Sequence, residues 1–249
     1  MPEKTVTGWL AGLALAPLTG SVSALRRSRM FHPRGVLCRA DVEAAPGSPA
    51  LADLASSLAG PALVRWSSAW WKRGERTDVL GCAIRFGSDP LNAVPQPGDQ
   101  DLLLATIRRP WSMAFAPWTT DFHDFLANHY YGVSPFLVDD RRVEWRLAPE
   151  REAPPGPSRN ERLKRAMSAG HASLRLELAD YSGPFFPPVG ESFQSVVRLQ
   201  LREEVELDQE ALSFDPFRAG RGITPVGFVH FMRKATYLAS QRARPRHGR

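Results

Sequence analysis

The sequence VLGCAIRF at residues 79–86 decides the fold class of this chain. Large apolar side chains stand at every second position of this stretch, which places them on one face of a β-strand. Residues 63–66 and the apolar run DLLLATI at residues 101–107 also predict strands, the second of them buried. The polar stretch 87–100, between the strands expected over 79–86 and 101–107, predicts a loop.

Proline and glycine residues mark the remaining elements. The expected elements are a helix over 50–58, a helix over 119–131, a loop over 151–160, strands over 173–178, 196–201 and 205–207, and a C-terminal helix over 226–243. Strands outnumber helices, and no alternation of strand, helix and strand is visible. The sequence therefore predicts an α+β protein that is mainly β, with antiparallel strands.

The composition is that of a globular protein, with 249 residues, of which 43% are hydrophobic and 23% are charged. Two cysteines, Cys38 and Cys82, are too few for a disulfide scaffold and form no CxxC zinc motif. The net charge is +6, and only four of the 32 basic residues are lysines. Arginine suits bidentate contacts with carboxylates and phosphates, although an arginine-biased genome explains the excess equally well. A prediction of nucleic-acid binding would depend on this net charge alone, so no nucleic-acid partner is expected.

The N-terminal stretch 5–25 carries no charge, and arginines follow it at once. A membrane helix needs about 20 consecutive apolar residues, whereas Gly12 and Pro17 interrupt this stretch. We therefore expect residues 1–28 to form an apolar arm or short helix that packs on the domain or on a partner chain, in a cytoplasmic protein. Membrane contact through residues 5–25, export after a signal peptide and a homodimer stay open as alternatives.

The sequence lacks the motifs GxGxxG, GxxxxGK[ST], GxSxG and HExxH. His123 and His129 lie six residues apart, which separates them by about 120° on the expected helix. This spacing makes them poor joint metal ligands, so we interpret both as ordinary surface or half-buried histidines.

The C-terminal helix carries a more informative pattern. Arg233, Tyr237 and Arg244 fall at roughly 0°, 40° and 20° around a helix and so share one stripe. Neighbouring cations favour the phenolate form of a tyrosine by lowering its pKa, and one class of haem protein uses tyrosine as the axial ligand. On these three residues alone, a solvated arginine face is the simpler explanation.

Four blocks of the sequence together resemble the catalase family in order and spacing. They are residues 29–35 (RMFHPRG, similar to RxxHxxG), residues 64–67 (VRWS, similar to VRFS), residues 78–86 (DVLGCAIRF, similar to DxRGxAxKF) and residues 214–244, where FDP and GITP precede RKATY and Arg244. The blocks span about residues 29–107 and 212–244. The resemblance implies a catalase-type closed antiparallel β-barrel surrounded by helices, as one domain over residues 29–249.

The resemblance also implies a b-type haem, with iron as its metal. Tyr237 would be the iron ligand, and Arg233 would keep its phenol ionised. Three further arginines match family positions that pair with the haem propionates, and bidentate arginine–carboxylate contacts are strong. They are Arg29, Arg65 and Arg244.

The resemblance implies that His32 is the acid–base group. A neutral imidazole takes a proton from peroxide and returns it to the departing oxygen. Ser67 matches the serine that hydrogen-bonds this histidine, and it lies two residues from Arg65 on an expected strand. Arg65 and Ser67 should therefore face the same side.

The sequence departs from the family at the distal amide, where a segment like DLVGNN supplies an asparagine. The matching residues 101–106 read DLLLAT, so Thr106 offers only a hydroxyl. The change disfavours efficient dismutation and favours a peroxidase that takes hydrogen peroxide or organic hydroperoxides. Trp66, Trp70 and Trp71 fit either the lining of an organic-substrate pocket or the barrel core.

The function implied is thus a haem-dependent oxidoreductase that uses peroxides. The alternative is a non-enzymatic member of the same fold, either a haem carrier or sensor or a scaffold without haem. The lost asparagine and a chain shorter than typical catalases favour this alternative.

Overall fold

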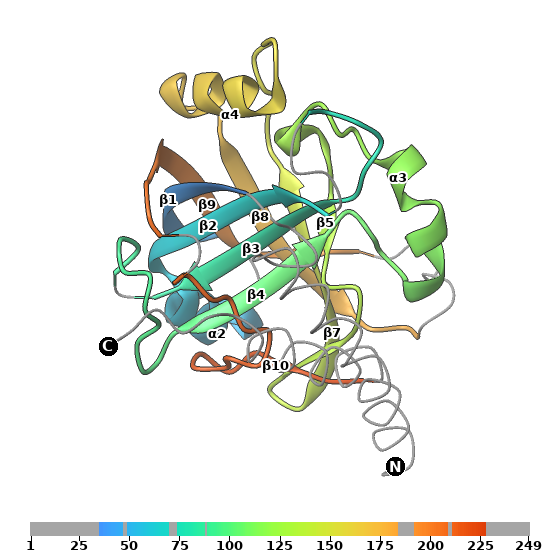
Figure 1. Ribbon diagram of the computed structural model, residues 1–249. Coiled ribbons are helices and arrows are strands. Elements are labelled where there is room, and N and C mark those ends of the chain that lie inside the picture. The colour runs from blue at the N-terminus through green and yellow to red at the C-terminus, as the bar shows by residue number, and fades with distance from the viewer. Residues whose placement is uncertain are drawn as a thin grey trace.

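A computed structural model describes residues 35–46, 49–69, 74–87, 89–183, 192–208 and 211–227 of the chain (Figure 1). The expected N-terminal arm 1–28 and residues 228–243 of the expected C-terminal helix lie outside the described residues.

Antiparallel strands form one sheet that closes on itself. The strands are β1 (Gly35–Ala44), β2 (Gly60–Ser68), β3 (Leu80–Phe86), β4 (Gln100–Ala105), β5 (Tyr130–Tyr131), β6 (Phe136–Val138), β7 (Arg141–Pro149), β8 (Ser173–Asp180), β9 (Gln194–Glu204) and β10 (Thr224–Pro225). They pair in the order β10-β6-β7-β5-β4-β3-β2-β1-β9-β8, and a further β7–β8 pairing closes an eight-stranded barrel. The prediction of a mainly β fold with a closed antiparallel barrel is confirmed.

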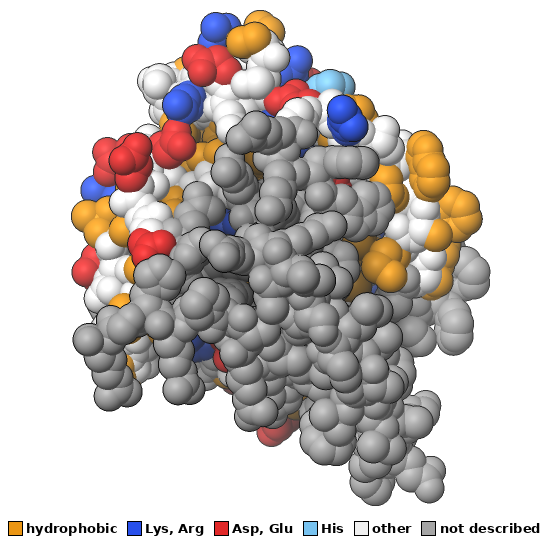
Figure 2. Space-filling view, viewed as in Figure 1, with side chains coloured by type: hydrophobic (Ala, Val, Ile, Leu, Met, Phe, Trp, Pro, Cys, Tyr) orange, Lys and Arg blue, Asp and Glu red, His pale blue; other side chains and the backbone are white. Residues whose placement is uncertain are grey.

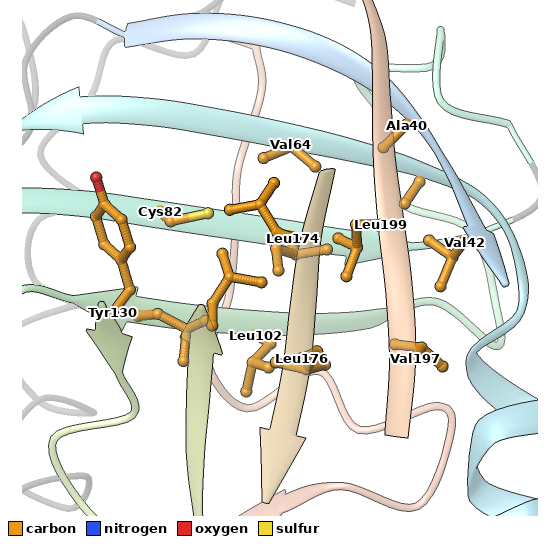
Figure 3. Close-up of a cluster of buried hydrophobic side chains, with 14 of the residues drawn as sticks. Ala40, Val42, Val64, Cys82, Leu102, Tyr130, Leu174, Leu176, Val197 and Leu199 are labelled. Atoms are coloured by element: carbon orange, nitrogen blue, oxygen red, sulfur yellow. The ribbon is translucent and has the colours of Figure 1, made fainter. Parts of the chain in front are cut away.

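Alternate side chains of these strands fill the barrel. Figure 3 shows inward side chains from different strands meeting, among them Val64, Cys82, Tyr130 and Leu176. Trp66 is also fully buried here, with its ring centroid 5.2 Å from that of Tyr130. Trp66 is therefore a core residue of the barrel. Trp70 and Trp71 lie outside the described residues.

Short helices pack around the barrel. They are η1 (Pro49–Leu51), α2 (Ala52–Leu58), η2 (Pro110–Ala114), α3 (Ala116–Thr119), η3 (Phe125–Ala127) and α4 (Arg159–Ser168), of which the three η elements are 3-10 helices. Helix α2, within the helix expected over 50–58, packs on β1 and β9. Helix α4 follows the expected loop, and its N-terminus is capped by Ser158, whose side chain accepts from the backbone N–H of Glu161 at 3.3 Å.

The helix expected over 119–131 is wrong. This segment instead contains the end of α3, the single turn of η3 and both residues of β5. Asp121 and Asp124 each accept a hydrogen bond from the backbone N–H two residues later, at 2.9 and 2.8 Å. The amide of Asn128 donates to the backbone carbonyls of the same two residues, at 2.8 and 2.7 Å. These local bonds compete with the pairing that a continuous helix needs.

The strand expected over 205–207 is also wrong, because β9 ends at Glu204. The backbone N–H of Val205 donates to the carbonyl of Leu37 at 2.8 Å, and the chain then leaves the sheet. Val205 and Leu207 pack against a second apolar cluster, which includes Leu37 and Leu63. This cluster lies on the outer face of the barrel, because Leu37 and Leu63 alternate with inward-pointing residues.

Candidate functional site

Four neighbouring strands place small residues side by side on the outer face of the barrel. Gly35 in β1 pairs with Ser67 in β2, Ser67 with Gly81 in β3, and Gly81 with Ala105 in β4. The residues that alternate with them fill the barrel core, so these four face outward. We call them the small-residue row. No side chain in the row is larger than serine, so other groups, the side chain of Arg65 at Gly35 among them, can approach the sheet backbone closely here.

Arg65 lies beside the small-residue row and is buried. It precedes Ser67 by two residues in β2, so both side chains point to the same face, as the sequence predicts. A Cβ atom added to Gly35 would lie 2.9 Å from Cζ of Arg65 and 2.5 Å from the carbonyl oxygen of Trp66. The guanidinium therefore rests directly against the backbone of Gly35. The row and this buried cation together fit a flat ligand that carries a carboxylate.

Thr106 lies just beyond the end of β4, outside the small-residue row. Its Oγ1 accepts from the backbone N–H of Leu80 at 3.1 Å and lies 2.8 Å from the hydroxyl of Thr120. The Thr106 hydroxyl thus ties the end of β4 to β3 and to the residue that follows α3. Ala105, whose methyl group has no hydrogen-bonding capacity, occupies the position next to Gly81 on the outer face.

Asp101 in β4 fixes the FDP block to this outer face. Nε of Arg85 donates to Oδ1 of Asp101 at 3.0 Å, Arg218 forms a second ion pair, and the backbone N–H of Asp215 donates to Oδ2 at 2.8 Å. Burial raises the pKa of Asp101, and its contacts with the two arginines oppose that rise. Phe214 packs in the outer apolar cluster, with its ring centroid 4.9 Å from Cζ of Arg85.

Gln100 holds the GITP block at residues 222–225. Its amide nitrogen donates to the carbonyl oxygens of Arg218 at 2.8 Å and Ile223 at 3.1 Å, and its Oε1 accepts from the N–H of Ile223 at 3.3 Å. The following residues pair with β6 as β10. The continuously described chain ends at Gly227, beside the connection between β5 and β6.

The sequence patterns did not predict a charged cluster that lies on the outer face of the barrel. Glu144 in β7 accepts from Nε of Arg108 at 3.0 Å and from Nη1 of Arg109 at 2.7 Å, and both Glu144 and Arg109 are buried. Among the described residues, no group accepts a hydrogen bond from Nε or Nη2 of Arg109. Arg146 and Glu177 form a further ion pair at 2.6 Å. The only sequence signal is the position of Glu144 and Arg146 between inward-facing apolar residues of β7.

The two histidines singled out in the sequence form no joint site. His123 is exposed, and its Nδ1 lies 2.9 Å from Oε2 of Glu75. His129 is exposed and stands edge-on to the ring of Tyr131, and desolvation, followed by the charge of Arg146, lowers its pKa. Over the described part of the chain, no group of three or more His, Cys, Asp or Glu residues could hold a metal ion. No helix in that part has the length and apolar character to cross a bilayer.

The remaining predicted site residues lie outside the described residues. They are Arg29, His32, Arg233, Tyr237 and Arg244. Their roles stay predictions.

The barrel, its strand order and the covering segments define a catalase-like fold. A fungal catalase matches with a TM-score of 0.62 and 15% identity, over 90% of this chain and 61% of the catalase. A bacterial catalase matches with a TM-score of 0.61 and 12% identity, over 89% of this chain and 58% of the catalase. The chain thus spans about three fifths of the length of these catalases. No protein-family model and no curated protein matches the sequence.

Proposed function

We propose that the chain is a haem-dependent oxidoreductase that uses hydrogen peroxide or organic hydroperoxides. The observation that carries the proposal is the small-residue row with the buried Arg65 beside it. One end of the row is Gly35, only three residues after His32, so the chain limits their separation to about 11 Å. Tyr237 follows ten residues after Gly227.

Tyr237 and four arginines would hold the haem. In this proposal the phenolate of Tyr237 ligates the iron of a b-type haem, and Arg233, one turn earlier on the expected helix, keeps the phenol ionised. Arg65 supports one propionate from the outer face of the barrel, with Arg29 and Arg244 as further partners. When bound, the haem supplies the redox chemistry of O–O cleavage.

His32 and Ser67 would handle the proton. The imidazole of His32 accepts the proton of the peroxide and delivers it to the departing oxygen, which is general acid–base catalysis. Ser67 lies in the small-residue row, on the same face as Arg65, and its hydroxyl orients the imidazole in this proposal.

Ala105 directs the proposal toward peroxidation. The methyl group of Ala105 donates no hydrogen bond to a second peroxide molecule. The hydroxyl of Thr106 accepts from the N–H of Leu80 and lies 2.8 Å from the hydroxyl of Thr120, which itself donates to the carbonyl of Ala116, so the proton of Thr106 is taken up by Thr120. Dismutation needs two peroxide molecules to react in turn at the same face. Peroxidation, with an organic co-substrate that donates hydrogen or with an organic hydroperoxide, does not require a second hydrogen peroxide molecule to be bound at this face.

The same observation supports a second candidate, a haem-binding or haem-free protein without catalysis. The methyl group of Ala105 supplies no hydrogen-bond donor, but the small-residue row and Arg65 are present in either case. The two candidates differ in whether haem-loaded protein turns over peroxide.

Steady-state turnover of hydrogen peroxide and cumene hydroperoxide by haem-loaded protein separates them. His32→Ala should lower kcat/KM by about 100-fold or more, because an acid–base group contributes about 10²–10⁴ in rate. His123→Ala is the matched control, since His123 is exposed and its Nδ1 pairs with the surface residue Glu75. Haem-loaded wild type without turnover would favour the second candidate, and equal activity of His32→Ala would remove His32 from the mechanism.

Thr106 needs its own test as a catalytic residue. Thr106→Val removes the hydroxyl and keeps the shape, so the loss of its bond to the Leu80 N–H should cost about 1–3 kcal/mol in the free energy of unfolding. Turnover should stay within twofold of wild type if the hydroxyl serves only the fold. A tenfold loss of kcat with haem content intact would instead give Thr106 the catalytic role.

A further inference from the structure

An apolar patch stands on one edge of the molecule, away from the barrel core. It consists of Trp111, Met113, Phe115 and Trp118, whose exposed fractions lie between 49% and 76%. All four belong to η2, α3 or the residue between them. Figure 2 shows hydrophobic side chains gathered at this edge of the molecule, where Figure 1 places α3. Single exposed apolar residues are ordinary, but a group of large ones marks an interaction site.

The apolar patch belongs to a stretch without charge. Residues 110–120 contain no Asp, Glu, Lys or Arg. The hydroxyls of Ser112, Thr119 and Thr120 each donate to a backbone carbonyl of the same stretch or of Arg109, at 2.9, 3.2 and 2.7 Å. The backbone N–H groups of residues 112, 115 and 118 are also paired locally, at 3.0 Å each. Moving this stretch out of water therefore leaves few polar groups to desolvate.

The stretch is held firmly from behind. Ala116 is buried against Ala69 and Val79, which lie at the ends of the β2–β3 connection. Arg109, at the base of the stretch, is fixed by its buried ion pair with Glu144. The four patch residues are thus presented outward by an anchored segment.

We propose that the apolar patch inserts into the interfacial region of a phospholipid bilayer. Tryptophan and phenylalanine are enriched at that depth, where an apolar ring can be buried while the indole N–H stays near the headgroups. A protein partner would expect about one hydrogen bond per 100–200 Å² of interface, whereas the hydroxyls of this stretch are already paired within it.

The patch also adjoins the candidate site. Ala105, at the end of the small-residue row, and Ile107 pack against the same cluster as Ala116. Insertion would bring this end of the row to the membrane surface. The binding itself does not depend on the proposed peroxidase function, and its test needs no haem.

Co-sedimentation of the full chain with vesicles tests the proposal. The probes are vesicles of phosphatidylcholine alone and of phosphatidylcholine with 20% phosphatidylserine, which separate the apolar from the electrostatic contribution. Phe115→Ser combined with Trp118→Ser should weaken binding to both vesicles at least tenfold. Leu91→Ser combined with Val94→Ser is the matched control, because Leu91 and Val94 are 58% and 60% exposed elsewhere on the surface. The control should bind like wild type.

Three results would overturn the proposal. The first is wild type that binds neither vesicle, and the second is a patch variant that binds as well as wild type, which would assign membrane contact to residues 5–25. The third is a wild-type dimer by light scattering that becomes monomeric in the patch variant without vesicle binding, which would assign the patch to a second copy. Because all four exchanged residues are exposed, circular dichroism should confirm that both variants keep the fold.

Discussion

At the scale of single residues, Gly35 sets how closely Arg65 approaches the sheet. In Gly35→Ala, the new Cβ would collide with the Arg65 guanidinium and with the carbonyl oxygen of Trp66. We expect the free energy of unfolding to fall by about 1–3 kcal/mol, and haem uptake to weaken because Arg65 must move. Urea denaturation and haemin titration measure the two effects.

Gly170→Ala is the control for Gly35→Ala. Its added Cβ meets nothing within 4 Å, but its φ of 68° disfavours alanine. It should therefore lose stability without any change in haem affinity. Equal haem affinity in wild type and Gly35→Ala would contradict the placement of Arg65 at the candidate site.

The two buried cysteines predict an alkaline instability. Burial, with a smaller contribution from Glu204, raises the pKa of Cys38 to about 12, and burial raises that of Cys82 well above its usual value. Between about pH 9 and pH 12 the unfolded state loses these protons and the folded state keeps them. Stability is therefore complete below pH 9 and falls above it, by up to about 1.4 kcal/mol per pH unit for each thiol.

Urea denaturation of wild type and Cys38→Ala between pH 8 and pH 11 measures this loss. The variant starts from a lower stability because of its cavity, but its stability should fall less steeply with pH. Parallel curves for the two proteins would contradict the buried, protonated thiol.

The sequence predicted that Arg65 and Ser67 lie on the same face of a strand, because side chains two residues apart on a strand point to the same side. The same rule separates Ala105 from Thr106, so the pleat decides which of the two lies on the outer face next to Gly81. The pairing of Arg109 with Glu144 joins residues from separate strands and loops, and a local pattern carries no such information.

At the scale of elements, one carboxylate connects the barrel to the segment that covers it. Asp101 in β4 is buried between Arg85 and Arg218 and accepts the N–H of Asp215. Asp101→Asn removes the charge that both arginines need, and breaking a buried pair in this way costs about 3–5 kcal/mol. Asp180→Asn is the control, because Asp180 is 75% exposed in its pair with Arg141, and such pairs contribute about 0–1 kcal/mol.

Urea denaturation of both variants compares the two aspartates. Proteolysis of the native proteins should also cut the covering segment 211–227 faster in Asp101→Asn than in wild type. Equal stability of the two variants would show that the ion pairs of Asp101 do not hold this segment.

Elements with a regular pattern were predictable, and those shaped by local polar bonds were not. The strands over 63–66, 79–86 and 101–107 follow from alternation and apolar runs. The region 119–131 has helical spacing of apolar residues, yet the side chains of Asp121, Asp124 and Asn128 divert its backbone into turns. The spacing of apolar residues does not show whether the backbone will form helical hydrogen bonds or the side-chain hydrogen bonds of turns.

At the scale of the whole molecule, long-range pairing closes the barrel. Strand β1 pairs with β9 across a separation of about 160 residues, and β7 pairs with β8 around the loop and α4. Periodicity indicates that strands exist but not which strands meet, so the closed barrel was predictable only through the resemblance to catalases. The structural likeness to catalases supports that resemblance for the fold.

Haem and its ligand Tyr237 are the basis of the function proposed for this chain. The most direct test is the ultraviolet–visible spectrum of the protein purified from haem-supplemented cells, recorded beside that of Tyr237→Phe. We predict a Soret band with ferric high-spin charge-transfer features in wild type and their loss in the variant, because phenylalanine keeps the ring but cannot ligate iron. A colourless wild type that takes up no added haemin would contradict haem binding, and an unchanged spectrum in Tyr237→Phe would contradict the proposed ligand.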